Sequence, residues 1–124
     1  MKHEDKDLLL KDLCARMPYN PLVEYKGESY NVLGIAHGRL VLCKPFMSYT
    51  LRENPLVEEA KPYLFPLSSM TEEQIKEFNS ITQKCSTYIG KSILLTDFCN
   101  KHHIDWRGFI EKELAIDATG LNIY

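Results

Sequence analysis

The chain has 124 residues, of which 44% are hydrophobic and 26% charged, and its formal net charge is −2. Such a composition is ordinary for a soluble globular protein, and the length suffices for one domain, residues 1–124, with a single core. The apolar runs are too short to cross a bilayer, and the charged N-terminus lacks the apolar segment of a signal peptide. We therefore expect a cytoplasmic protein that does not enter membranes.

The first predicted element is an amphipathic helix over residues 5–17. Its apolar residues recur at helical spacing: Leu9, Leu10, Leu13, Cys14 and Met17. Asp12 and Arg16 fall elsewhere on the helical wheel, and Pro18 ends the helix. The narrow apolar stripe indicates a helix that packs one face on the domain; a helix that binds a partner is the alternative.

Residues 22–60 read as short strands joined by tight turns. The candidate strands cover residues 22–26, 29–33, 39–43, 46–51 and 56–60. Gly27-Glu28 and His37-Gly38 are the expected turns, and Gly34 marks a bulge. Consecutive strands of this kind predict a small antiparallel meander or an SH3-like barrel of four or five strands.

Residues 61–71 form a predicted hinge between the first half of the chain, residues 1–60, and a helical half, residues 72–124. Pro62 and Pro66 each remove a backbone donor, which argues against a central strand or a helix interior. The hinge is nevertheless apolar. We therefore expect it to lie on the core and to join the two halves.

The helical half is predicted to be a three-helix segment, with helices over residues 72–84, 92–102 and 106–117. Thr71 and Gln74 have the spacing of a capping box, and Asp105 suits the N-cap of the last helix. A helix-turn-helix from the last two helices is disfavoured, because the face expected to read DNA is acidic. With the N-terminal helix and the strands, this segment completes a predicted α+β fold.

The densest polar cluster contains Cys99, His102 and His103. The four cysteines form no C-x-x-C pair, so we expect reduced, mostly buried thiols. The preferred interpretation places both histidines in the last turn of a helix, where their rings satisfy free carbonyls. Two alternatives stay open: a metal site completed from a distance, and a cysteine nucleophile with a histidine base. Because no catalytic motif accompanies the cluster, we expect no catalytic residue, no bound metal and no cofactor.

Two surfaces are candidates for binding. The first is a strand face around tyrosines, since tyrosine gives contact area at a low entropic cost. The second is a corner at the start of the last predicted helix. The candidate residues are Tyr30, Arg39 and Tyr49 on the strands and His102, His103 and Arg107 at the corner.

Three segments resemble stretches of small uncharacterised proteins from Bacteroides-type gut bacteria, their prophages and their mobile elements. The segments are residues 7–19 (DLLLKDLCARMPY), 61–73 (KPYLFPLSSMTEE) and 102–112 (HHIDWRGFIEK). The resemblance brings no activity, cofactor or catalytic residue with it. What it implies is a setting, namely a small accessory protein of phage or mobile-element origin.

These observations lead to one functional hypothesis and one alternative. We expect a non-enzymatic accessory protein that binds another protein, in an oligomeric state that the sequence leaves open. The alternative is a module that binds a nucleotide or nucleic acid through its β half, using side chains such as Arg39, Lys44 and Arg52. Neither half of the chain is basic, so charge does not favour nucleic acid as the partner.

Overall fold

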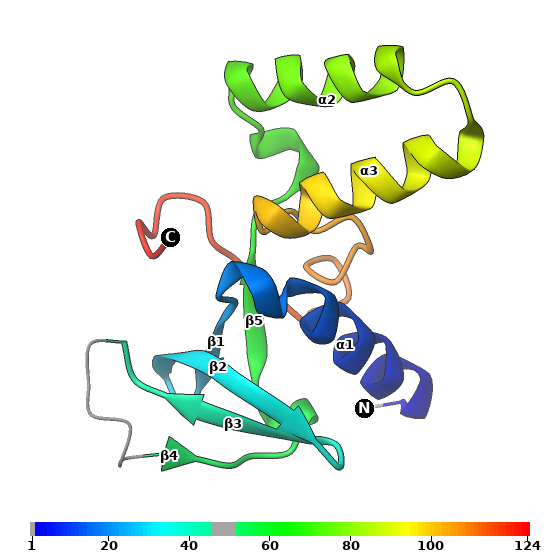
Figure 1. The fold of residues 1–124 in the computed structure, drawn as a ribbon. Coiled ribbons are helices and arrows are strands. Elements are labelled where there is room, and N and C mark those ends of the chain that lie inside the picture. Colours follow the sequence, from blue (N-terminus) through cyan, green and yellow to red (C-terminus); the bar gives the residue numbers. More distant parts are fainter. Residues whose placement is uncertain (1, 46–51) are drawn as a thin grey trace.

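The computed structural model describes residues 2–45 and 52–124, and it has the α+β architecture expected from the sequence (Figure 1). The helices are α1 (His3–Arg16), α2 (Glu72–Lys84) and α3 (Tyr88–Lys101). The strands are β1 (Leu22–Tyr25), β2 (Glu28–Ala36), β3 (Arg39–Cys43), β4 (Arg52–Glu53), β5 (Lys61–Leu64) and β6 (Ile116–Asp117). None of the helices in the described part is long and apolar enough to cross a membrane.

The six strands form one sheet in the order β4-β3-β2-β1-β5-β6. Neighbours are antiparallel except β5 and β6, which pair in parallel. The predicted meander is therefore confirmed by β1, β2 and β3. The sheet stays open, because β4 and β6 end it on opposite sides, so the expectation of an SH3-like barrel is wrong.

Two tight turns and one bulge set the register of the meander. Lys26 and Gly27 have φ of 51° and 78°, and His37 and Gly38 have φ of 53° and 73°. Consecutive positive φ angles characterise the type I′ turn, whose twist matches that of the paired strands. The first turn lies one residue earlier than predicted, and the second lies where predicted. The β2–β3 register shifts between Val32 and Gly34, which confirms the bulge expected at Gly34.

The predicted hinge contains a strand inside the sheet, β5, which corrects the expectation drawn from Pro62. Pro62 lies opposite Val23 of β1, while pairing with β6 begins only at the next residue, Tyr63. A proline fits there because the strand has a neighbour on one side only at that position. Tyr63 and Leu64 are buried, so this part of the hinge does lie on the core as expected.

Two other strand predictions have different outcomes. Residues 57–59 form a 3₁₀ helix instead of the expected strand over residues 56–60. Leu56 alone keeps a strand-like bridge, to Arg39. The strand expected over residues 46–51 lies outside the described residues.

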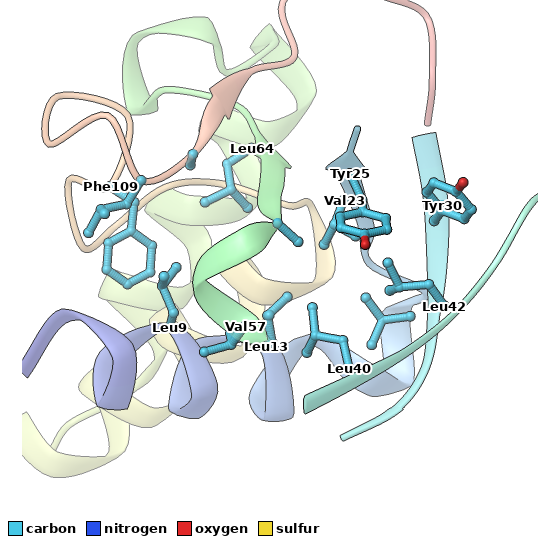
Figure 2. Close-up of a cluster of buried hydrophobic side chains, with 14 residues drawn as sticks. Leu9, Leu13, Val23, Tyr25, Tyr30, Leu40, Leu42, Val57, Leu64 and Phe109 are labelled. Atoms are coloured by element: carbon cyan, nitrogen blue, oxygen red, sulfur yellow. The ribbon is translucent and has the colours of Figure 1, made fainter. Parts of the chain in front are cut away.

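Helix α1 crosses one face of the sheet, and the main core lies between them. Figure 2 shows Leu9 and Leu13 of α1 pointing toward Leu40 of β3 and the 3₁₀ residue Val57. Phe109, from the segment after α3, closes the same cluster. Each fully buried side chain of this kind stabilises the fold by about 1.5–3 kcal/mol, so this cluster is the main source of stability.

A buried ion pair anchors α1 to the C-terminal end of α3. Asp12 and Arg16 are both 0% exposed, and Arg16 Nε donates to Asp12 Oδ2 at 2.8 Å. Arg16 also donates to the carbonyl oxygen of Ile104 at 2.7 Å and to that of Cys99 at 3.5 Å. Each carbonyl also accepts from a backbone N–H, Cys99 O from Ile104 N at 2.8 Å and Ile104 O from Trp106 N at 3.1 Å, so the guanidinium adds charge-assisted bonds to them.

Helices α2 and α3 form an antiparallel hairpin that extends away from strands β2 to β4 (Figure 1). The predicted capping box is confirmed, because Gln74 N donates to Thr71 Oγ1 and Thr71 N donates to Gln74 Oε1. Helix α3 begins at Tyr88 rather than at residue 92, with Thr87 Oγ1 accepting from Gly90 N at 3.1 Å. Tyr88, Ile89 and Gly90 are therefore helical, although the prediction placed them between two helices.

The helix expected over residues 106–117 is not formed. Residues 106–115 make a chain of turns, and Ile116–Asp117 is strand β6. Both carboxylate oxygens of Asp105 are engaged, accepting from the backbone N–H groups of Phe109 and Ile110 at 2.9 Å each. Gly108 and Glu113 then take φ of 78° and 61°, values that interrupt a right-handed helix.

Candidate functional site

One exposed surface of the hairpin is unusually apolar. We call it the α3 apolar surface, and it consists of Tyr88, Ile89, Ile93 and Leu94, which are 86%, 72%, 57% and 46% exposed. Single exposed apolar side chains are common, but four of them within two turns of one helix are unusual, so this surface is a candidate binding site.

The exposure follows from where α3 is covered. The buried residues of α3 all lie in its C-terminal half, which packs against other parts of the protein. They are Phe98, Cys99 and Asn100. The N-terminal half runs beside α2 (Figure 1), and none of its residues is buried. Helix α2 itself contains no fully buried residue, and the hairpin's own apolar cluster lies at the other end, where Phe78 and Ile81 of α2 pack against Phe98.

A small notch of about 270 Å³ lies beside Ile93, lined also by Ser92, Thr96 and Asp97. Ser92 Oγ donates to the carbonyl oxygen of Tyr88 at 3.1 Å, and Thr96 Oγ1 donates to that of Ser92 at 2.7 Å. Both hydroxyl protons are already donated to carbonyls of the helix. An apolar side chain can therefore fill the notch without leaving a hydrogen-bond donor unpaired.

A second site is a cleft of about 670 Å³ over the face of the sheet opposite the main core. Its floor crosses three strands, since Leu22 of β1 pairs with Asn31 of β2, and Asn31 pairs with Cys43 of β3. The 3₁₀ turn at Tyr19 and Asn20 forms one side. The remaining lining residues are Val32, Leu33, Lys44, Pro45, His103, Ile123 and Tyr124.

His103 and Tyr124 form a rigid wall of the cleft. Their rings stack with centroids 3.6 Å apart and an angle of 13° between planes. The Tyr124 hydroxyl accepts from Leu22 N at 2.9 Å and donates to the carbonyl oxygen of Tyr63 at 3.0 Å. Burial of that hydroxyl raises the pKa of Tyr124 to about 12, although 44% of the whole residue remains exposed. The wall is thus tied to both β1 and β5.

His103 is held neutral. Burial, followed by the positive charges of Arg16 and His102, lowers its pKa from 6.5 to about 4. Its Nδ1 atom is buried and has no hydrogen-bond partner among the described residues. A buried polar atom without a partner costs about 1–3 kcal/mol, so this ring is held at an energetic disadvantage.

The candidate residues on the strands do not form one exposed face in the described part. Tyr30 is only 6% exposed and its hydroxyl donates to Glu28 Oε2 at 3.2 Å. Arg39 is exposed, but its guanidinium donates to the carbonyl oxygen of Asn54 at 3.0 Å. Tyr49 lies outside the described residues.

The corner residues divide among separate roles. His102 caps the backbone of α3, and its Nε2 atom lies 3.4 Å from Glu77 Oε2 of α2 instead of reaching free carbonyls. Arg107 donates to Asp12 Oδ1 at 3.2 Å and lies over the Trp106 ring, so it extends the buried ion pair. Only His103 of the three lines the cleft.

The chemistry of Cys99 does not suit a nucleophile. The thiol is buried, and burial raises its pKa, which lowers the fraction of reactive thiolate. Within residues 2–45 and 52–124, no group of three or more His, Cys, Asp or Glu side chains converges as a metal site would require. Of the four cysteines, Cys43 and Cys99 are buried, whereas Cys14 is exposed.

Comparison with known proteins adds no relative: no family model, no curated protein and no solved structure matches the chain. The functional argument therefore depends on the geometry of the two sites. The sequence analysis predicted a helix over residues 92–102 but did not identify the exposed surface that Ile93 and Leu94 form. A signal was available, because Tyr88, Ile89, Ile93 and Leu94 together span more of the helix circumference than one buried stripe.

Proposed function

We propose that this protein is a non-enzymatic protein-binding module, and that the α3 apolar surface binds an amphipathic helix of its partner. The proposal depends on one observation, which is the exposure of four apolar side chains in the N-terminal half of α3: Tyr88, Ile89, Ile93 and Leu94. An amphipathic helix laid along such a surface buries its own apolar face at the same time. A helix therefore suits this surface better than an extended peptide, which needs a free strand edge.

The energetics support a specific but modest interaction. Burying one large apolar side chain contributes about 1.5–3 kcal/mol, and association costs at least several kcal/mol in lost freedom of motion. Ile89 and Ile93 lie on one face, and Tyr88 and Leu94 lie on opposite sides of it, so the gain exceeds the cost only when a partner covers both isoleucines and at least one of these neighbours. Ile89 and Ile93, which lie one turn apart, are the expected centre of the interface.

The notch defines what the partner must carry. An aliphatic or aromatic side chain fits beside Ser92 and Thr96, whose hydroxyls already donate within the helix. Asp97 lines the same notch, is exposed and forms no ion pair with any described residue. We infer a partner helix with an apolar anchor and a lysine or arginine close to it.

The resemblance of residues 7–19, 61–73 and 102–112 to proteins of phages and mobile elements supports an accessory role for this binding. Nucleic acid is less favoured as the partner, because Lys44 pairs with Glu28 at 2.8 Å and Arg39 donates to a carbonyl. Two of the basic side chains near the strands, Lys44 and Arg39, are therefore engaged in internal contacts.

The test is a selection of amphipathic helical peptides displayed on phage, with the intact protein as bait. We expect enriched peptides to carry apolar residues at i, i+4 and a nearby basic residue, and to shift the NMR signals of residues 88–97. Ile93→Ser should abolish their binding. The matched control is Leu121→Ser, because Leu121 is 48% exposed but lies outside the surface; it should bind like the wild type.

Three results would contradict the proposal. Enriched peptides could bind Ile93→Ser as tightly as the wild type, or shift signals only outside α2 and α3. Sedimentation could also show a dimer of the wild type that Ile93→Ser converts to a monomer, with no peptide enriched. In that last case the surface binds a second copy of this chain, and the partner proposed here is wrong.

A further inference from the structure

The cleft over the sheet carries polar groups that the fold leaves unused, and none of them belongs to the α3 apolar surface. We propose that this cleft binds a small uncharged ligand with neighbouring hydrogen-bond donor and acceptor groups, of the amide or lactam type. This inference is independent of the protein-binding function, since no residue lines both sites.

Two amides supply both kinds of hydrogen-bonding group. Asn31 lies on the floor of the cleft, in the row between Leu22 and Cys43. Asn20 lies at the edge, in a left-handed conformation with φ of 56°. Neither side chain forms a hydrogen bond with any described residue. A carboxamide presents an acceptor oxygen and a donor N–H group side by side, so it complements another amide.

The third group is His103, which lines the cleft and is 9% exposed. Its ring is fixed by the stack on Tyr124, and its Nδ1 atom has no partner among the described residues. A neutral imidazole has one donor and one acceptor nitrogen. Because Nδ1 is inaccessible, a ligand in the cleft meets the rest of the ring, which presents a neutral surface held in place by the stack on Tyr124.

The charges of the cleft favour an uncharged ligand. Lys44 is the one basic side chain among the described lining residues, and its Nζ atom lies 2.8 Å from Glu28 Oε2. The described lining residues include no acidic side chain. Because Glu28 neutralises Lys44, an ionic ligand would lose its hydration for little gain in attraction.

The size and walls of the cleft define the rest of the ligand. Its volume of about 670 Å³ lies in the range of small-molecule sites. Leu22, Val32 and Ile123 provide apolar contacts between the polar groups. A ring with an amide edge matches this arrangement, because its faces are apolar and its edge donates and accepts hydrogen bonds.

The experiment uses 2-pyridone as the probe, titrated into the ¹⁵N-labelled protein and followed by NMR. We expect shifts at residues 20–22, 31–33 and 103. N-methyl-2-pyridone, which lacks the N–H donor, should bind about tenfold more weakly, as should 2-pyridone to the variant Asn31→Leu. Asn79→Leu is the matched control, since Asn79 is an exposed residue of α2; it should bind like the wild type. Benzoate and benzylammonium should not bind in the cleft.

Any of four results would overturn the inference. Saturating 2-pyridone could cause no shift in the wild-type protein, or shifts only outside the cleft. Its N-methyl derivative or either charged ring could bind as tightly as 2-pyridone. Asn31→Leu and His103→Asn could also both keep full affinity for 2-pyridone. Asparagine is chosen at position 103 because it readily adopts the φ of 58° found there.

Discussion

Asp12 and Arg16 of α1 are completely buried, whereas Ile89 and Ile93 of α3 are mostly in solvent. Each pair is in the environment that its residue type ordinarily avoids. The buried charges have partners, because Arg16 bonds to Asp12 and to the carbonyl of Ile104. The exposed isoleucines have none in the described chain beyond their own helix and α2.

The two regions therefore tell different things about the molecule. A buried ion pair is costly to desolvate and tolerates little change in geometry, so it fixes where α1 sits on α3. An exposed apolar helix face gains free energy only when something covers it. The first region is satisfied by folding alone, whereas the second is the surface for which we propose a partner. Four experiments test this contrast, in order of decreasing effect.

The largest effect is expected for Asp12→Ala. It leaves the guanidinium of Arg16 buried without its counter-charge and also removes the acceptor for Arg107. We expect the free energy of unfolding to fall by about 3–5 kcal/mol, measured by urea denaturation. The control is Asp7→Ala, whose exposed carboxylate meets only His3, and it should change stability by less than about 1 kcal/mol. Equal effects of the two variants would show that burial of the pair does not matter.

Asp105→Asn should have the next largest effect. The carboxylate accepts from two backbone N–H groups, of Phe109 and Ile110, and an amide offers one acceptor oxygen in place of two. We expect a loss of about 2 kcal/mol in thermal unfolding. Asp117→Asn should cost less, because Asp117 is exposed and accepts from one backbone N–H, of Thr119. A larger loss for Asp117→Asn would contradict the role assigned to Asp105.

The neutral His103 makes stability depend on pH. Its pKa is about 4 in the folded protein and 6.5 when unfolded, so the unfolded state binds more protons between these values. Stability from this group is full above pH 6.5 and falls with decreasing pH, by at most about 1.4 kcal/mol per pH unit. His103→Asn should flatten this slope between pH 7 and pH 5 in urea denaturation. An unchanged slope would show that the histidine is not held neutral.

The smallest effect on stability is expected for the double variant Ile89→Ser and Ile93→Ser. Both side chains are more than half exposed, so the free energy of unfolding should change by less than about 0.5 kcal/mol per site. Leu9→Ala, in the core, should cost about 2–5 kcal/mol in the same urea titration. A large loss from the double variant would mean that the α3 apolar surface is covered within the folded protein.

The sequence predicted those elements whose determinants are local. Thr71 and Gln74 cap α2 as expected, and the glycines at 27, 34 and 38 mark two turns and a bulge. The periodicity of the first helix also identified Leu9 and Leu13 as core residues. Each of these features depends on residues within a few positions of one another.

The failures involve partners that are distant in sequence. Nothing near Arg16 indicates that it bonds to the carbonyl oxygen of Ile104. Pro62 fits inside the sheet only because β6 begins to pair one residue later. The cleft was not predicted for the same reason. It is lined by Asn31, His103 and Tyr124, which are distant from one another in the sequence. Local pattern could not bring them together.

The order in which the chain is made gives the position of Arg16 one more consequence. Its carbonyl partners, on Cys99 and Ile104, are 83 and 88 residues further along. While the ribosome is still translating the middle of the protein, Leu9 and Leu13 of α1 already have apolar partners such as Leu40 and Val57, but the guanidinium of Arg16 lacks its two carbonyl acceptors. The contact between α1 and the end of α3 therefore forms only when the last quarter of the protein has been made, so it is among the last contacts of the fold to be completed.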